Sequence, residues 1–221
     1  MNVSKMALQA PHQGGLVQTA GEPLGVAKAA MLMVHGRGAS AEDILSLAEQ
    51  LDVAGFAYFA PQASNNTWYP NSFLSPISDN EPWLSSALAF MEEVMATISK
   101  AGIAPENSMI LGFSQGACLT LEYAIRHVQR YGGLIGLSGA LIGPDTMLRD
   151  YSGTLAGTPV FLGCSDVDFH VPKERVDGAA AVLGRLGGDV TERLYPNMAH
   201  TVNQDEIDFI RRMMQSVLAG I

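Results

Sequence analysis

Ser114 lies at the centre of residues 112–116, which read Gly-Phe-Ser-Gln-Gly and so match the spacing Gly-x-Ser-x-Gly. In a nucleophile elbow this spacing places a serine at the strained tip of a strand-to-helix turn, where flanking side chains do not fit. The apolar run 108–111 predicts a buried strand before the turn, and apolar residues recur at helical spacing from 117 to 128. The context therefore predicts that Ser114 is the nucleophile of an acyl-transfer reaction.

A serine hydroxyl needs an adjacent base, and the base needs an acid that orients it. In such sites the acid follows the serine in the chain and the histidine follows the acid. His200 lies between the last predicted strand and the last predicted helix, so we expect it at the same sheet edge as Ser114 and assign it as the base. Asp166 and Asp168 both follow the predicted strand 159–163, and spacing alone does not choose between them.

Other reactive interpretations of these side chains carry less weight. Asp166, Asp168 and His170 are metal-ligand types, but a metal there would duplicate the function of a triad, so we do not expect a metal site. Cys118 lies inside the helix predicted after Ser114, where a cysteine is more often a buried apolar residue than a nucleophile.

Acyl transfer also needs donors for the negative oxygen of the tetrahedral intermediate. The backbone N–H of Gln115 is one candidate, because it begins a helix whose dipole favours negative charge. The second donor should follow an early strand, and there Arg37 stands between Gly36 and Gly38. We expect its backbone N–H to complete the oxyanion hole, and we expect the neighbouring His35 to be structural.

These residues need a scaffold that brings several loops to one edge. Short apolar strand patterns alternate with amphipathic helical patterns, which is typical of an α/β fold with a mainly parallel sheet and helices on both faces. Ser40 with Asp43, and Asn203 with Glu206, have the spacing of helix-capping pairs. The predicted strands are 29–34, 56–60, 108–111, 133–137, 159–163 and 190–195, with 16–19 as a candidate edge strand; the other predicted helices are 82–99 and 172–186.

The long segment 61–81 separates a predicted strand from the next helix without clear periodicity. Loops of this length in compact domains are commonly functional or disordered, and a disordered linker seldom carries aromatic residues. This loop contains Trp68, Tyr69 and Phe73 and follows a carboxyl end of a strand, where ligands bind in open α/β sheets. We expect these three side chains to form a wall of the substrate site, the alternative being an aromatic loop that only packs over the sheet.

Composition limits the class of protein. The 221 residues fit a single domain, and the net charge of −9 argues against nucleic acid or an anionic membrane as partner. No apolar run is long enough to span a bilayer, and residues 1–15 lack the apolar stretch of a signal peptide. We therefore expect a cytoplasmic protein in which Cys118 and Cys164 are buried thiols. A homodimer is one candidate assembly.

Together, the segments around residues 35–38, 112–116, 168–172 and 200 resemble the phospholipase/carboxylesterase family of α/β-hydrolases, which includes acyl-protein thioesterases and bacterial carboxylesterases. The resemblance spans the chain from about residue 29 to the final helix. It implies an α/β-hydrolase fold without a separate cap domain, no cofactor, and Asp168 as the acid, because an aspartate three residues before Val171-Pro172 is typical of the family.

The resemblance also bears on the substrate. Many thioesterases of the family carry Trp-Phe-Asp in the long loop, where this chain has Trp68-Tyr69-Pro70, and Asp-Pro where this chain has Asp168-Phe169. These departures favour a bacterial type of serine carboxylesterase that hydrolyses small to medium esters through an acyl-enzyme. Within the family an acyl-thioesterase or a lysophospholipase is the alternative; from another class, a non-catalytic ligand sensor on the same scaffold remains.

Overall fold

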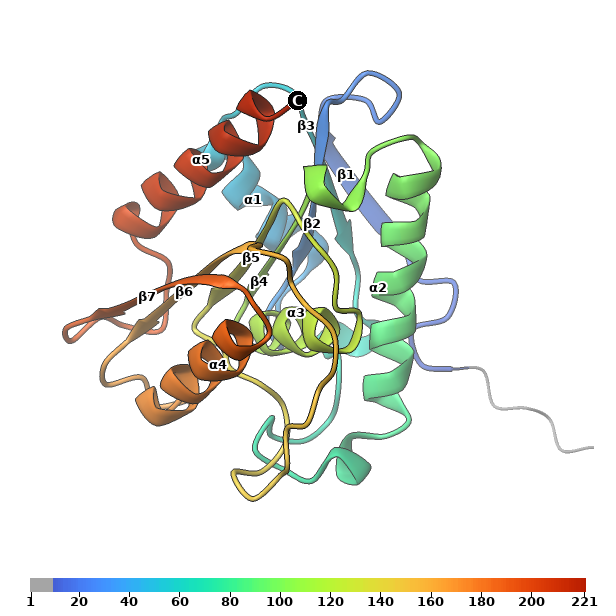
Figure 1. Cartoon of the computed structure of the whole chain (residues 1–221). Helices are drawn as coiled ribbons and strands as arrows, with labels where there is room; N and C mark the ends of the chain where they lie inside the picture. Colours follow the sequence, from blue (N-terminus) through green and yellow to red (C-terminus); the bar gives the residue numbers. More distant parts are fainter. Residues whose placement is uncertain (1–9) are drawn as a thin grey trace, which may run out of the picture.

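The computed structural model describes residues 10–221, and its centre is a seven-stranded sheet (Figure 1). The strand order from edge to edge is β1-β3-β2-β4-β5-β6-β7. β1 runs antiparallel to β3, whereas the other neighbours are parallel. The strands are β1 (Val17–Gly21), β2 (Ala29–Val34), β3 (Phe56–Pro61), β4 (Ser108–Phe113), β5 (Gly133–Leu137), β6 (Pro159–Ser165) and β7 (Asp189–Tyr195).

Helices cover both faces of the sheet. One face packs against α2, α3 and α4, and the other against α1 and α5, so that each face has its own apolar core (Figure 1). The α-helices are α1 (Ala41–Leu51), α2 (Trp83–Lys100), α3 (Gln115–Arg126), α4 (Lys173–Arg185) and α5 (Gln204–Ala219); short 3-10 turns are η1 (Ser64–Asn66), η2 (Ile77–Asn80) and η3 (Pro105–Asn107).

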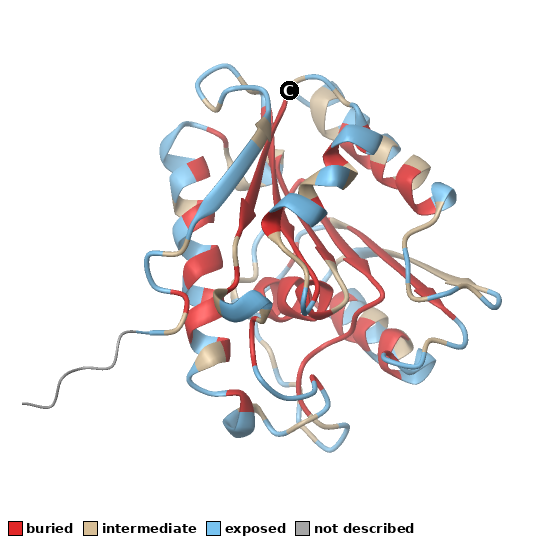
Figure 2. Cartoon of the chain, turned by 180° about the vertical axis from the view of Figure 1, so that it is seen from behind, coloured by how far each residue is buried: buried red, intermediate tan, exposed pale blue. Residues whose placement is uncertain are grey.

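Burial follows the position of each strand in the sheet. The inner strands β2, β3 and β5 are buried at every residue, because helices cover both of their faces. The edge strand β1 is mostly exposed, and β7 at the other edge is half-buried (Figure 2). Unbroken apolar runs such as Ala-Ala-Met-Leu-Met-Val in β2 are therefore the sequence pattern of a central parallel strand.

The predicted fold class is confirmed, and the predicted strands and helices are present with small shifts of their ends. Both capping pairs form: the Ser40 side chain accepts from the Asp43 N–H, and Asn203 accepts from the Glu206 N–H. The helix α3 ends at Arg126, before the predicted end at residue 128. We expected residues 1–15 to lack the apolar stretch of a signal peptide. Residues 1–9 of this segment lie outside the described residues.

The carboxyl ends of the parallel strands meet at one edge of the sheet, which positions the candidate site. β2 leads into the turn 35–38, β3 into the loop 62–82, and β4 into Ser114. β6 leads into residues 166–172 and β7 into residues 196–203. Five segments that are far apart in sequence thus converge on one region of the surface.

Candidate active site

Ser114 occupies the strained turn that its sequence context predicts. Its backbone has φ 55° and ψ −119°, outside the ordinary regions for a residue with a side chain, and it connects β4 directly to α3. A Cβ added to Gly112 would lie 2.3 Å from the carbonyl oxygen of Gly116, and one added to Gly116 would lie 2.1 Å from that of Val34. The two flanking glycines therefore allow the backbone of the turn to pack directly against neighbouring backbone, and this packing keeps Ser114 in its strained conformation.

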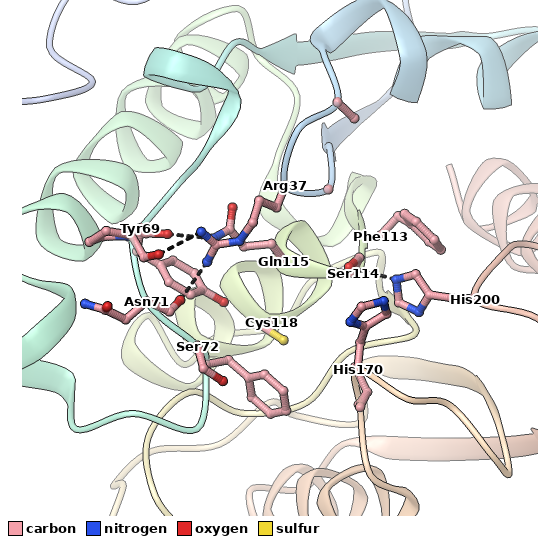
Figure 3. Close-up of a pocket in the computed structure, with 15 residues that line it drawn as sticks. Arg37, Tyr69, Asn71, Ser72, Phe113, Ser114, Gln115, Cys118, His170 and His200 are labelled. Atoms are coloured by element: carbon pink, nitrogen blue, oxygen red, sulfur yellow. Dashed lines mark hydrogen bonds between the residues drawn. The ribbon is translucent and has the colours of Figure 1, made fainter.

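Ser114, His200 and Asp168 form one hydrogen-bonded chain, of which Figure 3 shows the link between Ser114 and His200. The Nε2 atom of His200 lies 2.9 Å from the Ser114 Oγ, and its Nδ1 atom lies 2.7 Å from the Asp168 Oδ2. An ionised carboxylate only accepts, so Nδ1 carries the proton and Nε2 is free to accept from the serine hydroxyl. The arrangement is that of a nucleophile, a base and an acid that orients the base.

The environment of Asp168 keeps its carboxylate charged. The side chain is fully buried, and burial alone would raise its pKa. The hydrogen bond with His200 and the backbone N–H groups of His170 and Val171, which donate to Oδ1 at 2.7 and 3.1 Å, outweigh this and lower the pKa of Asp168 below its ordinary value. A charged acid is what stabilises an imidazolium.

Hydrogen bonding distinguishes Asp168 from Asp166 as partner of His200, a choice that the sequence spacing did not make. Asp168 reaches His200, whereas Asp166 is exposed and its Oδ1 accepts from the backbone N–H of Asn197 at 2.8 Å. Asp166 thus ties the loop that carries His200 to the end of β6. Two rings flank the imidazole of His200: Phe113 with a centroid distance of 5.0 Å and His170 with 4.9 Å. These contacts restrict the orientation of the base.

The side chains of Arg37 and Gln115, the residues whose backbone amides are the candidate oxyanion donors, lie on the opposite side of Ser114 from His170 and His200 (Figure 3). Gln115 is the first residue of α3, so its backbone N–H has no acceptor inside the helix. The turn 35–38 packs against the nucleophile, because a Cβ on Gly36 would lie 3.4 Å from the Ser114 Cβ. Arg37 therefore follows a residue that packs against Ser114, so its amide in the turn 35–38 and that of Gln115 at the start of α3 come from two segments that meet there.

The expected substrate wall divides into residues that line a cavity and one that does not. Tyr69 and Phe73 line a cavity of about 500 Å³ that opens beside Ser114 and His200, with Cys118 and Val171 also in its lining. Trp68 is wholly buried and its Nε1–H donates to the carbonyl oxygen of His35 at 2.8 Å. The expectation that Trp68 contacts substrate is therefore wrong: its indole supports the loop from below, because its polar edge has a partner inside the protein.

Two buried histidines hold that tryptophan in place. The rings of His12 and His35 lie 5.4 and 5.0 Å from the Trp68 ring. Burial lowers the pKa of each histidine, which keeps the rings neutral. His35 accepts the N–H of Ala63 at Nε2 and donates from Nδ1 to the Gly36 carbonyl, so its role is structural, as expected.

Several residues at the site have roles that sequence reasoning missed. The side chains of Arg37 and Gln115 contact the backbone of residues 68–71, whereas only their amides were considered. The segment between β5 and β6 also reaches the site, where the Gly143 N–H donates to the Phe73 carbonyl at 2.7 Å. The length of that segment was a signal in the sequence that it could reach the site, but the segment carries no motif. Nothing in the sequence marks His12 as buried.

The remaining expectations concern thiols, metals and membranes. Cys118 and Cys164 are free and buried, which confirms the prediction of two buried thiols, and burial raises the pKa of the Cys118 thiol to about 11. Within residues 10–221, no three His, Cys, Asp or Glu side chains come together as a metal would require. In the same range, no helix has both the length and the apolar composition needed to cross a bilayer.

Comparison with known proteins places this geometry in a family. The model of the Phospholipase/Carboxylesterase family matches residues 19–218. A crystal structure of a phospholipase/carboxylesterase from Dyadobacter fermentans is 43% identical in sequence, with a TM-score of 0.87, and the match covers 92% of this chain and 96% of that one. Esterase PE8 at 22% identity and a TM-score of 0.74 shares the fold.

Curated relatives carry two kinds of name. Acyl-protein thioesterase 1 from Gibberella zeae is 33% identical over 53% of this chain and 51% of its own length, and the same protein from Saccharomyces cerevisiae is 30% identical over 62% and 63%. This chain thus matches only about half to two thirds of those relatives. A probable carboxylesterase, SOBER1-like, from Arabidopsis thaliana is 25% identical over 86% of this chain and 79% of its own length. On the extent of the family match, this chain belongs to the phospholipase/carboxylesterase family of α/β-hydrolases.

Proposed function

We propose that the protein is a serine carboxylesterase that hydrolyses small to medium carboxylic esters. The observation that carries the proposal is the chain of hydrogen bonds from Ser114 through His200 to Asp168, with distances of 2.9 and 2.7 Å. The strained turn at Ser114 and the membership of a family that contains carboxylesterases support it.

In the proposed mechanism, the Ser114 Oγ attacks the acyl carbon of the ester while the His200 Nε2 accepts the hydroxyl proton. The backbone N–H groups of Arg37 and Gln115 stabilise the negative oxygen of the tetrahedral intermediate. When the C–O bond to the alcohol breaks, His200 returns its proton to the departing oxygen and an acyl-Ser114 ester remains. Asp168 holds the imidazole in its tautomer and stabilises the imidazolium in both halves of the reaction.

Deacylation repeats these steps with water as the nucleophile. His200 removes a proton from the water as the hydroxyl oxygen attacks the acyl carbon, and the tetrahedral intermediate forms again in the same oxyanion hole. Its collapse breaks the bond to Ser114, whose oxygen regains a proton from His200, and the carboxylic acid leaves. The steps use side chains and backbone amides of the protein together with water.

The cavity supports an ester substrate of limited size. Its volume of about 500 Å³ is in the range of small-molecule sites, and Tyr69 and Phe73 close one wall while Cys118 lies in the interior lining. Tyr69, Phe73 and Phe113 place apolar rings in the cavity lining, so an acyl chain of a few carbons fits it. The natural substrate is proposed as a small molecule, and the protein as a single cytoplasmic domain spanning residues 1–221.

A second candidate function is thioester hydrolysis, because several relatives are named acyl-protein thioesterase. The two candidates share the acyl-enzyme and differ in the leaving group. Matched butyryl oxyesters and butyryl thioesters measure the preference directly, and a lysophospholipid tests the third leaving group. A carboxylesterase has the higher kcat/KM on the oxyester; a ratio in favour of the thioester replaces the first proposal by the second.

The experiment that tests catalysis itself is turnover of p-nitrophenyl butyrate by the parent protein and by Ser114→Ala. Loss of at least about 10³-fold in kcat is expected in the variant, because the acyl-enzyme no longer forms. Unchanged turnover in Ser114→Ala contradicts the proposal. Binding of esters with thermal stabilisation but without product formation by the parent protein points instead to a ligand sensor.

A further inference from the structure

Both residues whose amides are proposed for the oxyanion hole extend their side chains to the same loop. The Gln115 Nε2–H donates to the Tyr69 carbonyl oxygen at 2.8 Å, and its Oε1 accepts from the Trp68 N–H at 2.9 Å. The amide group of Gln115 thus joins the first turn of α3 to two successive residues of the loop. Its carboxamide is buried, so these hydrogen bonds do not compete with water.

Arg37 contacts the next two residues of that loop. Its guanidinium donates through Nη1 to the Pro70 carbonyl oxygen at 2.8 Å and through Nη2 to the Asn71 carbonyl oxygen at 2.6 Å (Figure 3). The planar guanidinium suits such a two-point contact, which a lysine ammonium would not reproduce. Together the two side chains contact residues 68–71 one after the other, and we call these contacts the double clamp.

The double clamp connects the aromatic wall of the cavity to the two residues whose amides are the proposed oxyanion donors. Residues 68–71 include Tyr69 and lie two residues before Phe73, and both aromatic side chains line the cavity. The segment belongs to no strand or helix, so its carbonyl groups depend on side chains for hydrogen-bond partners. A displacement of the wall therefore breaks hydrogen bonds to the two residues that supply the oxyanion amides.

Arg37 is the more exposed of the two residues and lies between Gly36 and Gly38. Two backbone hydrogen bonds hold the turn after it, from the Gly38 N–H to the Asn66 carbonyl oxygen at 2.7 Å and from the Ala39 N–H to the Gly36 carbonyl oxygen at 3.2 Å. The guanidinium holds the residue from the far end of its side chain. Because oxyanion donors act only when they are fixed at the right place, looser attachment costs transition-state stabilisation even when both amides remain.

We propose that the side chains of Arg37 and Gln115 are positioning residues: they hold the aromatic wall and the oxyanion amides as one unit, so that the wall sets the alignment of the donors. The inference rests on the proposed esterase function. It predicts a specific pattern, in which loss of a clamp side chain slows the chemical steps for every ester, including one too short to touch the wall.

The test compares kcat and KM for p-nitrophenyl acetate and p-nitrophenyl hexanoate in Arg37→Met and Gln115→Met. We expect kcat to fall about ten- to a hundred-fold on both esters, less than the loss of a whole donor, with KM within about two-fold. Affinity for butylboronic acid, which forms a tetrahedral adduct with a serine, should fall by the same factor. Arg37→Lys keeps the charge and one contact and should recover part of kcat.

Arg211→Met is the matched control. Its guanidinium also donates to two successive carbonyls, those of Gln50 and Leu51, but at the surface between α1 and α5. It should leave kcat on both esters unchanged. The proposal is overturned if the clamp variants keep their kcat on the acetate and only have a raised KM on the hexanoate, because that is the effect of a damaged wall alone. Turnover that survives Ser114→Ala would instead overturn the proposed function.

Discussion

Glu206 makes the stability of the protein depend on pH in a direction that a single substitution tests. It is fully buried at the third position of α5, where its Oε2 accepts from the Asn203 N–H at 2.8 Å. Its Oε1 has no hydrogen-bond partner among the described residues and packs against the Cα of Gly163. A buried carboxylate with one unpartnered oxygen favours its protonated form.

The size of the effect follows from its pKa. Burial raises the pKa of Glu206 from the ordinary 4.5 to about 7. The folded protein therefore binds more protons than the unfolded chain between these two values, and stability falls as the pH rises from 4.5 to about 7. The contribution is fully present below pH 4.5 and is lost above pH 7. At 1.36 kcal/mol per pH unit, the loss amounts to at most about 3 kcal/mol.

Glu206→Gln removes the ionisation and keeps an acceptor for the Asn203 N–H. Urea unfolding at pH 5, 6.5 and 8 should give nearly equal free energies for variant and parent at pH 5. At pH 8 the variant should be more stable by about 2–3 kcal/mol, or several degrees in Tm for a chain of this size. Glu42→Gln replaces an exposed glutamate in the first turn of α1; it is the control and should keep the pH dependence of the parent, because Glu206 is intact. An equal pH dependence in Glu206→Gln and the parent would refute the reasoning.

Three further substitutions test the site and its scaffold. Asp168→Asn should lower kcat on p-nitrophenyl butyrate by about 10³–10⁴-fold with the fold intact, because a carboxamide no longer holds the imidazole in one tautomer; a loss below ten-fold speaks against its role. Gly116→Ala should destabilise the protein by several kcal/mol in urea unfolding, since its Cβ would lie 2.1 Å from a β2 carbonyl oxygen, whereas Gly178→Ala, in open space on α4, should be neutral or stabilising by up to about 1 kcal/mol. Phe73→Ala should raise the ratio of octanoate to butyrate turnover by opening the wall; Leu74→Ala, outside the cavity lining, should not, and an unchanged ratio in both would remove Phe73 from the acyl site.

Local sequence signals account for most of the scaffold. The strand β2 reads as an unbroken apolar run because both of its faces are buried, and the start of α5 at Asn203 follows from a side-chain pair three residues apart. At the elbow Gly112 is needed for an equally local contact, because a Cβ there would lie 2.3 Å from the carbonyl oxygen of Gly116. Such features depend on neighbours in the chain, which a sequence displays directly.

The arrangement of the long loop depends on contacts across the chain. Trp68 could equally have faced a ligand, and only the His35 carbonyl oxygen, 33 residues away, decides that its indole points inward. His12 is buried against it although the sequence around residue 12 has no helical or strand pattern. The side chains of Arg37 and Gln115 are similar cases: the chain order predicts where their amides lie, but not which loop carbonyls their polar ends meet.

The central claim is that Ser114 is the nucleophile, and covalent labelling tests it most directly. A fluorophosphonate reacts with an activated serine and leaves a stable adduct that peptide mass spectrometry can locate. One adduct per chain is expected on the peptide that contains Ser114, with loss of ester turnover in proportion to labelling and no labelling of Ser114→Ala. An adduct on another residue, or full turnover in the labelled protein, would contradict the account.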